Sequence, residues 1–422
     1  MLMGKKSNAY VNKIAVIGLG YVGLPLALAF SKHYKVVGYD VNKKRVSSLQ
    51  KGMDSNLDVV VSANPNLIFG SNESAIKEAN IYIITVPTPV NAENIPDLSF
   101  LKSASQLVAK YLKQEDIIIY ESTVYPGVTE DFCVPILSEI SGLRYNTNFY
   151  CGYSPERISP GTDKYTLQNV VKVTSGSTTR VADLVDNLYK KIIVAGTYKA
   201  PSIKVAEAAK VIENTQRDVN IALMNELAMM FDKMDIDTSE VLDAAKTKWN
   251  FLDFKPGLVG GHCIGVDPYY LTYKSEESGY IPTLLHSSRK INNRVASFIV
   301  EKTIQLMIDA DKTIKSASVL IMGYTFKEDC ADTRNTKIKD IVEGLESCSC
   351  EVSVFDPYLS ANSCTNFISN PFDAKKKYDS IIVGVSHHEF VNYTTTDFKQ
   401  LSKGKLVLLD IKGIYNESSW KF

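Results

Sequence analysis

Cys263 has the side chain best suited to nucleophilic chemistry in this sequence. It lies in the segment GGHCIGVDPYY, residues 260–270, where two glycines allow a turn that leaves the backbone open to a ligand. Asp267 follows one helical turn later. A thiolate adds to a carbonyl and later leaves, so it can divide one difficult step into two. Judged alone, however, a cysteine beside two glycines is more often a small buried side chain, and both interpretations stay open at this point.

An upstream helical stretch carries polar side chains on one face. Lys210 and Asn214 are four residues apart, and Arg217 continues roughly the same face. Lysine and asparagine among alanines and valines are poor core residues, which a functional role would explain. The alternative is a solvated helix surface on which Glu213 and Arg217 form an ordinary ion pair.

A glycine motif, GLGYVG at residues 18–23, follows the apolar run KIAVI and opens a helical stretch. Asp40 ends the next apolar run, 22 residues after Gly18, which is the spacing at which a carboxylate accepts hydrogen bonds from an adenosine ribose. The helix N-terminus would face the pyrophosphate. The acidic residue predicts NAD rather than NADP, although Arg45 keeps a phosphate contact open. The motif residues that we expect at the cofactor are Gly18, Gly20, Tyr21, Val22 and Gly23.

Further polar residues follow strand-like runs. Thr88 lies in VPTP and Thr123 in ESTVYPGVTE, both at expected carboxyl ends of parallel strands, where ligands bind in open sheets. Glu156 lies between two prolines in SPERISPG and could act as a general base. The alternatives are two turn-forming threonines and a charge that stabilises a turn.

The elements that must position these residues fall into three regions, and the fold class is α/β. Residues 1–200 alternate short apolar runs with helical stretches, which predicts a Rossmann-like, doubly wound parallel sheet that binds NAD. The run VVKVTSG is expected to join this sheet like the others. Residues 201–310 form a central all-helical region with a long helix, Pro201 to Met234. Residues 311–422 predict a second, smaller Rossmann-like domain.

Composition excludes several other classes of protein. Lys+Arg and Asp+Glu both count 47 in 422 residues, and no basic run suggests nucleic-acid binding. No run of 18 apolar residues predicts membrane insertion, and the first residues lack a secretory signal, so we expect a cytoplasmic protein. Seven cysteines show no metal-ligand spacing. His387 and His388 have no ligand partner at metal spacing and are expected either at the surface or as groups that support a site residue, and His262 is expected to be structural. We predict no metal.

Together these motifs resemble the nucleotide-sugar 6-dehydrogenase family, and within it the UDP-N-acetylhexosamine members of bacterial surface polysaccharide synthesis. The resemblance runs from IAVIGLGYVGLPLA through PGLVGGHCIGVDPYYL to MGYTFKEDCADTRNT and VFDP. The cysteine and FKEDCADTR segments are highly specific, whereas the glycine motif alone is not. The resemblance implies a homodimer formed through the helical middle.

The resemblance also implies the reaction. The family oxidises the sugar C6 alcohol to a carboxylate and reduces two NAD. Cys263 would form a thiohemiacetal and then a thioester, which water hydrolyses. Glu156 would assist that hydrolysis, and Thr123 would contact water and the cofactor.

The family's remaining site positions carry over as follows. Lys210 would stabilise the developing oxyanion or move protons, Asn214 would donate to that oxygen, and Asp267 would position the water or the lysine. Arg334 stands at a position that touches NAD. The positions that touch the UDP-sugar are Arg157, Ile158, Lys210, Asn214, Arg217, Gly260, Phe326 and Lys327.

Departures from the family pattern bear on the substrate. Pro160 stands where the UDP-glucose enzymes carry a second glutamate, and the HCIGVDP motif also differs, which favours an N-acetylated sugar. UDP-N-acetylmannosamine relatives carry an arginine ahead of the cysteine loop, where Lys246 and Lys248 are the nearest basic residues here. Lysine lacks the bidentate geometry of arginine. UDP-GlcNAc is favoured, and UDP-GalNAc, UDP-ManNAc and UDP-glucose remain alternatives.

Two further hypotheses come from other classes. A two-electron hydroxyacid dehydrogenase of the 6-phosphogluconate type also joins a dinucleotide domain to a helical one, but it needs no cysteine. A non-catalytic NAD-sensing or scaffold protein would keep the glycine motif but need not keep the active-site groups, which are all present here.

Overall fold

The computed structural model describes residues 11–54, 59–157, 166–261, 264–372 and 376–422. The chain divides into two units, Met1–Glu213 with Tyr269–Tyr280 and Asn214–Pro268 with Ile281–Phe422. Helix α6, Ile203–Lys233, begins in the first unit and ends in the second. The sequence predicts three domains with boundaries at residues 200 and 310. Neither boundary interrupts a helix or a strand, and the division itself stays a prediction.

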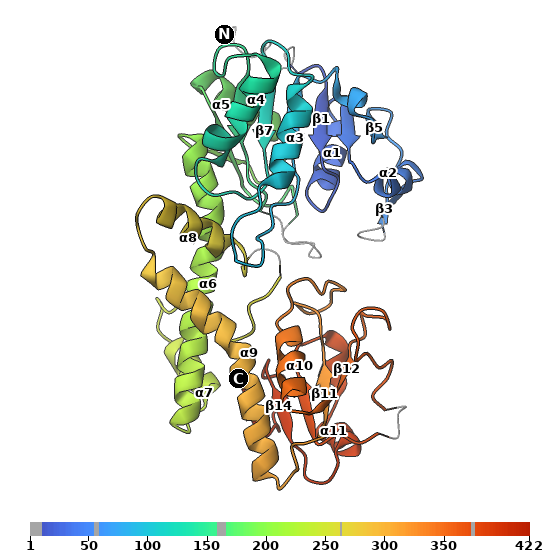
Figure 1. Cartoon of the computed structure of the whole chain (residues 1–422), viewed down its shortest axis with the longest axis vertical. Coiled ribbons are helices and arrows are strands. Elements are labelled where there is room, and N and C mark those ends of the chain that lie inside the picture. The colour runs from blue at the N-terminus through green and yellow to red at the C-terminus, as the bar shows by residue number, and fades with distance from the viewer. Residues whose placement is uncertain (1–10, 55–58, 158–165, 262–263, 373–375) are drawn as a thin grey trace. The chain divides into compact units, whose positions relative to one another are not determined.

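The first unit is built on an eight-stranded sheet (Figure 1). Its inner strands are short, rich in Ile, Val and Tyr, and buried along their whole length, as in parallel strands that helices cover on both faces. The sheet order reverses between β1 and β6, so the loops after these strands diverge there. The strands in spatial order are β10 (Thr197–Lys199), β9 (Lys172–Gly176), β8 (Tyr150–Tyr153), β7 (Ile117–Tyr120), β6 (Ile81–Ile84), β1 (Ile14–Ile17), β2 (Val36–Tyr39) and β5 (Leu67–Gly70).

Helices cover both faces of this sheet because alternate strand residues point to opposite sides. Ile14 and Val16 pack with α1 (Gly23–Ser31), α2 (Lys43–Gln50) and α5 (Thr179–Tyr189). Ala15 and Ile17 pack in the other layer, with α3 (Ser99–Ala109), α4 (Val134–Ser141) and the start of α6. The remaining short elements are β3 (Met53–Asp54), β4 (Val59–Val60), η1 (Glu73–Ile76) and the π-helical turn η2 (Val128–Cys133). The doubly wound fold is confirmed.

One expectation about this sheet is wrong. Strand β9, the run VVKVTSG, lies antiparallel to β8, with Tyr153 opposite Ser175 and Gly152 opposite Gly176. A parallel connection needs a long crossover, usually a helix. The described parts of the segment between β8 and β9 contain no helix, and β9 runs antiparallel to β8.

The central helices agree with the expected all-helical region. They are α6, α7 (Thr238–Ala245), α8 (Asp267–Glu277) and α9 (Thr283–Asp309). In the second unit, Asp218 of α6 is buried and accepts hydrogen bonds from Arg289 and Asn292 of α9. A buried ion pair with these extra hydrogen bonds fixes how the two helices pack.

The second unit also holds a five-stranded sheet in which every strand is parallel to its neighbours. Helices α9 and α10 (Ile338–Ser347) cover one face, and η3 (His388–Asn392) and α11 (Thr395–Leu401) cover the other. The order reverses between β11 and β13. The strands in spatial order are β12 (Glu351–Phe355), β11 (Ser318–Met322), β13 (Ser380–Val383), β14 (Leu408–Asp410) and β15 (Trp420–Lys421). The second Rossmann-like fold is confirmed.

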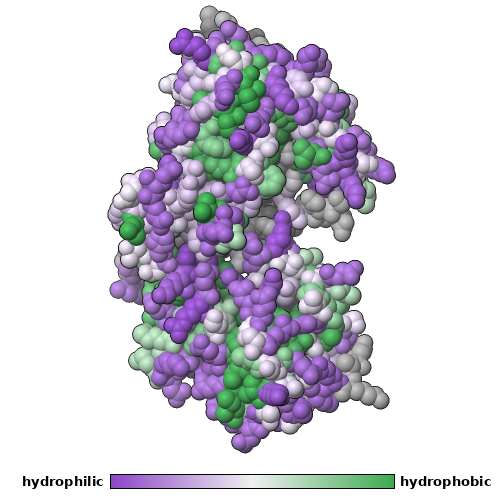
Figure 2. Space-filling view, in the orientation of Figure 1, coloured by the Kyte–Doolittle hydropathy of each residue, from purple (hydrophilic) through white to green (hydrophobic). Residues whose placement is uncertain are grey.

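The face drawn in Figure 2 is mostly hydrophilic, with scattered apolar patches. Among the described helices, none is long and apolar enough to cross a membrane. Helix α6 exposes Val205, Ile212, Leu223 and Met230. Their spacings of 7 (205 to 212), 11 (212 to 223) and 7 (223 to 230) residues place them on one side of the helix.

Candidate active site

The glycine motif forms the turn between β1 and α1. Gly18 has a φ of +95°, a conformation that favours glycine, and a side chain at Gly23 would meet the Gly18 carbonyl at 1.9 Å. A side chain at Gly20 would meet nothing within 4 Å, so the backbone there is open to a ligand. These are the roles that the three glycines play beside a dinucleotide pyrophosphate, and the site fits NAD.

Asp40 lies at the end of β2, directly beside this turn. Its Oδ2 accepts the Leu19 backbone N–H at 2.8 Å, and its Oδ1 accepts the Asn42 backbone N–H at 2.8 Å. Each oxygen keeps a lone pair for a ribose hydroxyl. Arg45 lies buried with its guanidinium against Asp54 and its Nε donating to the Leu19 carbonyl. Arg45 therefore braces the same turn, and its contact with the cofactor stays a prediction.

We expect Asp40→Asn to raise the KM for NAD about 10-fold or more and to leave the KM for the sugar nucleotide unchanged. A hydrogen bond to a charged group contributes about 1.5–3 kcal/mol, and the neutral amide loses that assistance. Initial rates with each substrate varied in turn measure both constants. An equal rise in both would refute the ribose assignment.

The ends of β6 and β7 bring together two threonines predicted to contact ligands. Thr88 Oγ1 donates to the Thr123 carbonyl at 2.7 Å. The buried Tyr270 hydroxyl donates to the Thr88 carbonyl at 2.8 Å, a contact that the sequence analysis missed. The two loops are thus fixed to each other at the sheet edge where the cofactor is expected.

Glu156 follows β8 and is held in place from several sides. Its Oε1 accepts the Arg157 backbone N–H at 2.5 Å, and its Oε2 lies 3.6 Å from the Lys172 ammonium. The Arg157 guanidinium pairs with Glu213 at 2.7 Å, so Glu213 is engaged here rather than in the i,i+4 pair considered for Arg217. Ile158 lies outside the described residues.

Helix α6 carries Lys210 and Asn214 one turn apart, and both are buried, with 6% and 9% of their surface exposed. The solvated-surface alternative is therefore wrong for these two residues, whereas Arg217 is exposed. Asn214 Nδ2 donates at 2.6 Å to Oδ2 of Asp267, the buried first residue of α8. The structure thus brings together Asn214 and Asp267, which are 53 residues apart in the sequence.

Glu207, one turn before Lys210, holds the loop that follows Thr123. Its fully buried carboxylate accepts the backbone N–H groups of Gly127 at 2.6 Å and Thr129 at 2.9 Å. Burial raises the pKa of Glu207 to about 7, against the lowering effect of these hydrogen bonds. The sequence analysis did not single out this residue.

The raised pKa predicts a pH dependence of stability. A carboxyl whose pKa is about 7 when folded, against 4.5 ordinarily, binds its proton more tightly in the folded state. Its contribution to the free energy of unfolding therefore falls as pH rises from 4.5 to 7. Because a pKa difference of one corresponds to about 1.36 kcal/mol, Glu207→Gln should gain about 3 kcal/mol relative to the parent protein over this range. Urea unfolding at pH 5 and pH 8 measures this change, and a constant difference between the two proteins would contradict it.

In the second unit, the segment before the cysteine packs on the loop that follows β11. A side chain at Gly261, where φ is +80°, would meet the Phe326 ring at 2.7 Å, and one at Gly260 would meet the Asn335 carbonyl at 2.6 Å. Asn335 Nδ2 donates to the Gly261 carbonyl at 3.2 Å. The segment before the cysteine and the FKEDCADTR segment therefore contact each other, because Gly260 and Gly261 allow close backbone approach. Cys263 and His262 lie outside the described residues.

A small pocket opens where this sheet reverses its strand order. Phe326 and Gly260, both predicted to touch substrate, line it. Lys327 follows Phe326 in the chain, and its ammonium lies 5.8 Å from the centre of the Phe326 ring. The other lining residues are Leu258, Thr325, Thr336, Lys337, Ile338, Gly384, Val385 and Lys412.

Lys412, Lys337 and the N-terminus of α10 are the groups of this pocket that could attract phosphate groups, and the Lys337 ammonium is paired with Asp340 at 2.8 Å. The sequence analysis missed Lys337 and Lys412. Lys412 could have been found, because it follows an apolar strand just as Thr88 and Thr123 do. Arg334, predicted at the cofactor, pairs with Asp332 in this unit at 2.6 Å, and its role stays a prediction.

The two adjacent histidines differ in their surroundings. His387 is fully buried, and its Nε2 lies 3.0 Å from Asp356 Oδ2. Asp356 directly follows β12 and accepts the Tyr324 backbone N–H at 2.7 Å, as Asp40 does for Leu19 in the first sheet. Burial would raise the pKa of Asp356, but the hydrogen bonds from His387 and the backbone lower it below its usual value. His387 thus caps the carboxylate that corresponds to Asp40.

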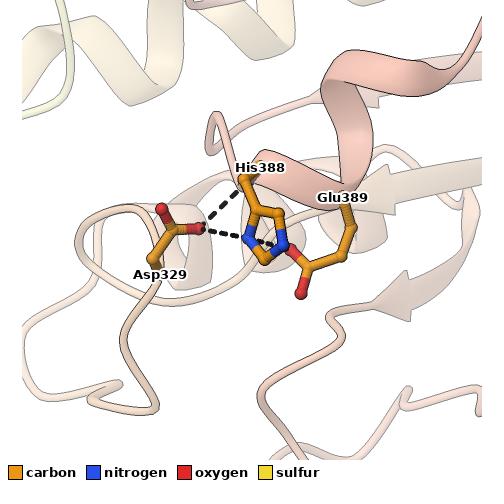
Figure 3. Close-up of side chains that lie close together, drawn as sticks. All are labelled: Asp329, His388 and Glu389. Atoms are coloured by element: carbon orange, nitrogen blue, oxygen red, sulfur yellow. Dashed lines mark hydrogen bonds and ion pairs between the residues drawn. The ribbon is translucent and has the colours of Figure 1, made fainter.

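His388 is exposed, but it does have carboxylate partners. Its Nδ1 lies 3.4 Å from Asp329 Oδ1 and 3.2 Å from Glu389 Oε2 (Figure 3). Among the described residues, these three side chains form the one group whose spacing could hold a metal ion. Their contacts are those of ion pairs on an exposed surface, and we assign no metal to them.

Geometry and chemistry together define a class of protein. The first sheet carries a turn that fits NAD, the second carries a pocket lined by lysines at its own reversal point, and helix α6 carries a buried lysine and a buried asparagine. This arrangement is that of an NAD-dependent dehydrogenase acting on a nucleotide-linked substrate.

Comparisons with known proteins then identify the family. Residues 12–193 match the NAD binding domain, 204–294 the central domain and 320–417 the UDP binding domain of the UDP-glucose/GDP-mannose dehydrogenase family. The chain belongs to this family, as the sequence motifs indicated. It is an enzyme, its cofactor is NAD, and its C-terminal domain binds a UDP-sugar.

Similar proteins with printed activities cover almost the whole chain. A UDP-N-acetyl-D-glucosamine 6-dehydrogenase of Salmonella typhi is 53% identical over 406 residues, covering 95% of this chain and 96% of that protein. One of Pseudomonas aeruginosa is 50% identical over 411 residues, covering 96% and 97%. The solved structure of the UDP-D-ManNAc dehydrogenase of Pyrococcus horikoshii has a TM-score of 0.87 at 28% identity, covering 97% and 98%.

Proposed function

We propose that this enzyme oxidises the C6 alcohol of UDP-N-acetylglucosamine to the carboxylate, with two NAD reduced per sugar. The observation that carries the proposal is the 53% identity with the Salmonella typhi UDP-N-acetyl-D-glucosamine 6-dehydrogenase, which extends over 95% of the chain. Solved structures of N-acetylmannosamine enzymes share the fold at 28% identity. The higher identity supports the gluco sugar.

The chemistry follows from this chain's own residues. NAD, when bound, supplies the hydride acceptor. The Cys263 thiolate adds to the C6 aldehyde carbon, and the resulting alkoxide oxygen is stabilised by Lys210 and by the Asn214 amide N–H. After oxidation to the thioester, Glu156 takes a proton from water as the water oxygen bonds to the same carbon. The carbon–sulfur bond then breaks, and the thiolate is regenerated.

Asp267 and the nucleotide pocket would position the reacting groups. The 2.6 Å hydrogen bond to Asp267 fixes the Asn214 amide with its N–H groups as donors and its oxygen away from the carboxylate. Lys337, Lys412 and the N-terminus of α10 would neutralise the UDP diphosphate in the second unit. Phe326 and Gly260 would shape the same pocket. Arg157, Ile158, Arg217 and Lys327 complete the proposed substrate contacts, and Thr123 and Arg334 those to NAD.

Initial rates on UDP-GlcNAc, UDP-GalNAc, UDP-ManNAc and UDP-glucose test the sugar assignment. We expect the largest kcat/KM for UDP-GlcNAc and the smallest for UDP-glucose, which lacks the acetamido group. A larger kcat/KM for UDP-ManNAc than for UDP-GlcNAc would contradict the proposal and identify the enzyme as a UDP-N-acetylmannosamine dehydrogenase.

We also propose that the enzyme is a cytoplasmic homodimer that supplies a uronic acid for surface polysaccharide. The six described cysteines are all free, which suits a reducing compartment. The exposed apolar side of α6, Val205 to Met230, would be covered by a second copy of the chain, because such a stripe is costly to leave in water. Sedimentation at equilibrium should give twice the mass of one chain, and the mass of one chain would refute the dimer.

A further inference from the structure

A buried charged cluster in the first unit lies in contact with Glu156. Lys172, the first residue of β9, donates to Glu121 Oε2 at 2.7 Å and lies 3.6 Å from Glu156 Oε2. The Tyr189 hydroxyl, at the end of α5, donates to the other oxygen of Glu121. The Lys172 ammonium also lies 5.3 Å from the centre of the Tyr189 ring. Lys172 is therefore held by several groups at once.

The reversed direction of β9 explains this arrangement. Tyr153 at the end of β8 stands opposite Ser175 of β9, so the antiparallel strand places its first residue, Lys172, alongside the segment that follows β8 and carries Glu156. Glu121 follows the end of β7, the next strand in the sheet. The two carboxylates and the ammonium thus come from three neighbouring strands at one edge of the sheet.

The three charged side chains of this cluster are almost completely buried. One ammonium faces two carboxylates, and the side chains of Lys172, Glu121 and Glu156 are 3%, 0% and 12% exposed. Burial raises the pKa of Glu121, Lys172 lowers it, and Glu156 raises it further. Glu121 alone would satisfy Lys172 as a structural ion pair. The second carboxylate, which is the most exposed of the three groups, is the one with a proposed chemical role.

Glu156 is consequently fixed at both of its oxygens. Oε1 accepts the Arg157 backbone N–H, and Oε2 faces the Lys172 ammonium. A general base must be held in one orientation to accept a proton from a positioned water. Lys172 can provide that orientation because Glu121 and Tyr189 leave its ammonium little freedom.

We propose that Lys172, held by Glu121 and Tyr189, is a positioning residue for Glu156 that the enzyme needs for thioester hydrolysis but not for hydride removal. The inference rests on the proposed function. In the affected step, Glu156 takes a proton from water, the water oxygen bonds to the thioester carbon, and the Cys263 thiolate leaves.

Lys172→Met tests this division between steps. With UDP-GlcNAc and NAD in rapid-mixing experiments, we expect a first burst of two NADH per active site at a rate within twofold of the parent enzyme. The steady-state rate that follows should fall about 10- to 100-fold, within the range that general-base catalysis contributes. Intact-protein mass after acid quench should show the acyl-enzyme accumulating. Lys172→Arg, which keeps the charge, should recover most of the steady-state rate.

Two further variants serve as controls for this experiment. The double variant Glu121→Gln, Lys172→Met removes both buried charges and leaves neither without its partner. It therefore replaces the single variant if Lys172→Met folds poorly. The double variant should show the same slow hydrolysis of the thioester. Lys199→Met removes an exposed lysine of the same unit, paired with Asp183, and should behave as the parent enzyme.

The outcomes separate the inference from the proposed function. Suppose that the parent enzyme yields two NADH per sugar. The positioning role of Lys172 is then wrong if the burst rate and the steady-state rate fall together in both methionine variants. It is also wrong if neither rate falls. If the parent enzyme produces no NADH from any UDP-sugar, the proposed function fails first and the inference falls with it.

Discussion

Cys263→Ala should abolish formation of the carboxylate product, with a loss of at least about 10⁴-fold in kcat, as expected when a covalent nucleophile is removed. Without the thiol, the aldehyde carbon has no attached sulfur from which a thioester can form. Cys263→Ser should instead stall as a slowly hydrolysed ester wherever the weaker oxygen nucleophile attacks. Product analysis by chromatography, together with NADH absorbance, measures both variants.

A matched control separates this effect from the general loss of a cysteine. Cys348 is exposed and lies at the end of α10, outside the proposed site. Cys348→Ala should retain full activity. Full activity of Cys263→Ala would instead favour a two-electron dehydrogenase that needs no cysteine.

Asn214→Ala should lower kcat about 10²- to 10³-fold with little change in the KM for either substrate, which is the usual cost of losing one oxyanion donor. The amide is buried and already oriented by Asp267 at 2.6 Å, so its second N–H is available without reorganisation. Steady-state kinetics with both substrates varied measures the effect.

The control for this prediction lies on the same helix. Asn220 donates to the Gln216 carbonyl one turn earlier on α6, on an exposed part of the helix. Asn220→Ala should change kcat by less than twofold. A rise in KM with an unchanged kcat for Asn214→Ala would mean that the amide binds substrate without stabilising the oxyanion.

Much of the cofactor site was predictable because its signals are local. The glycine turn, the helix that follows it and the carboxylate at the end of β2 lie within 23 residues, 18–40, and the structure places Asp40 beside the turn, where it accepts the Leu19 N–H. Its contact with the ribose stays a prediction. Lys210 and Asn214 could also be named as candidate site residues from the sequence. A lysine and an asparagine on an apolar helix face contribute little to packing, so another role would explain them.

The residues that were missed depend on how strands are arranged in space. Lys172 was visible as a charge in an apolar run, but its meeting with Glu156 requires β9 to run antiparallel to β8, and strand direction is not encoded in the run itself. The sequence did not decide whether His387 lies at the surface or supports a site residue, because its partner, Asp356, lies 31 residues away, directly after β12. Lys412 was recognisable as a polar residue after an apolar strand, but its place in the pocket beside Phe326 and Gly260 depends on the order of strands in the second sheet.

The number of NADH molecules formed per UDP-GlcNAc consumed tests the central claim most directly. With limiting sugar nucleotide and excess NAD, we expect two NADH and one UDP-linked uronic acid per sugar. One NADH per sugar, with an aldehyde or ketone as product, would contradict it.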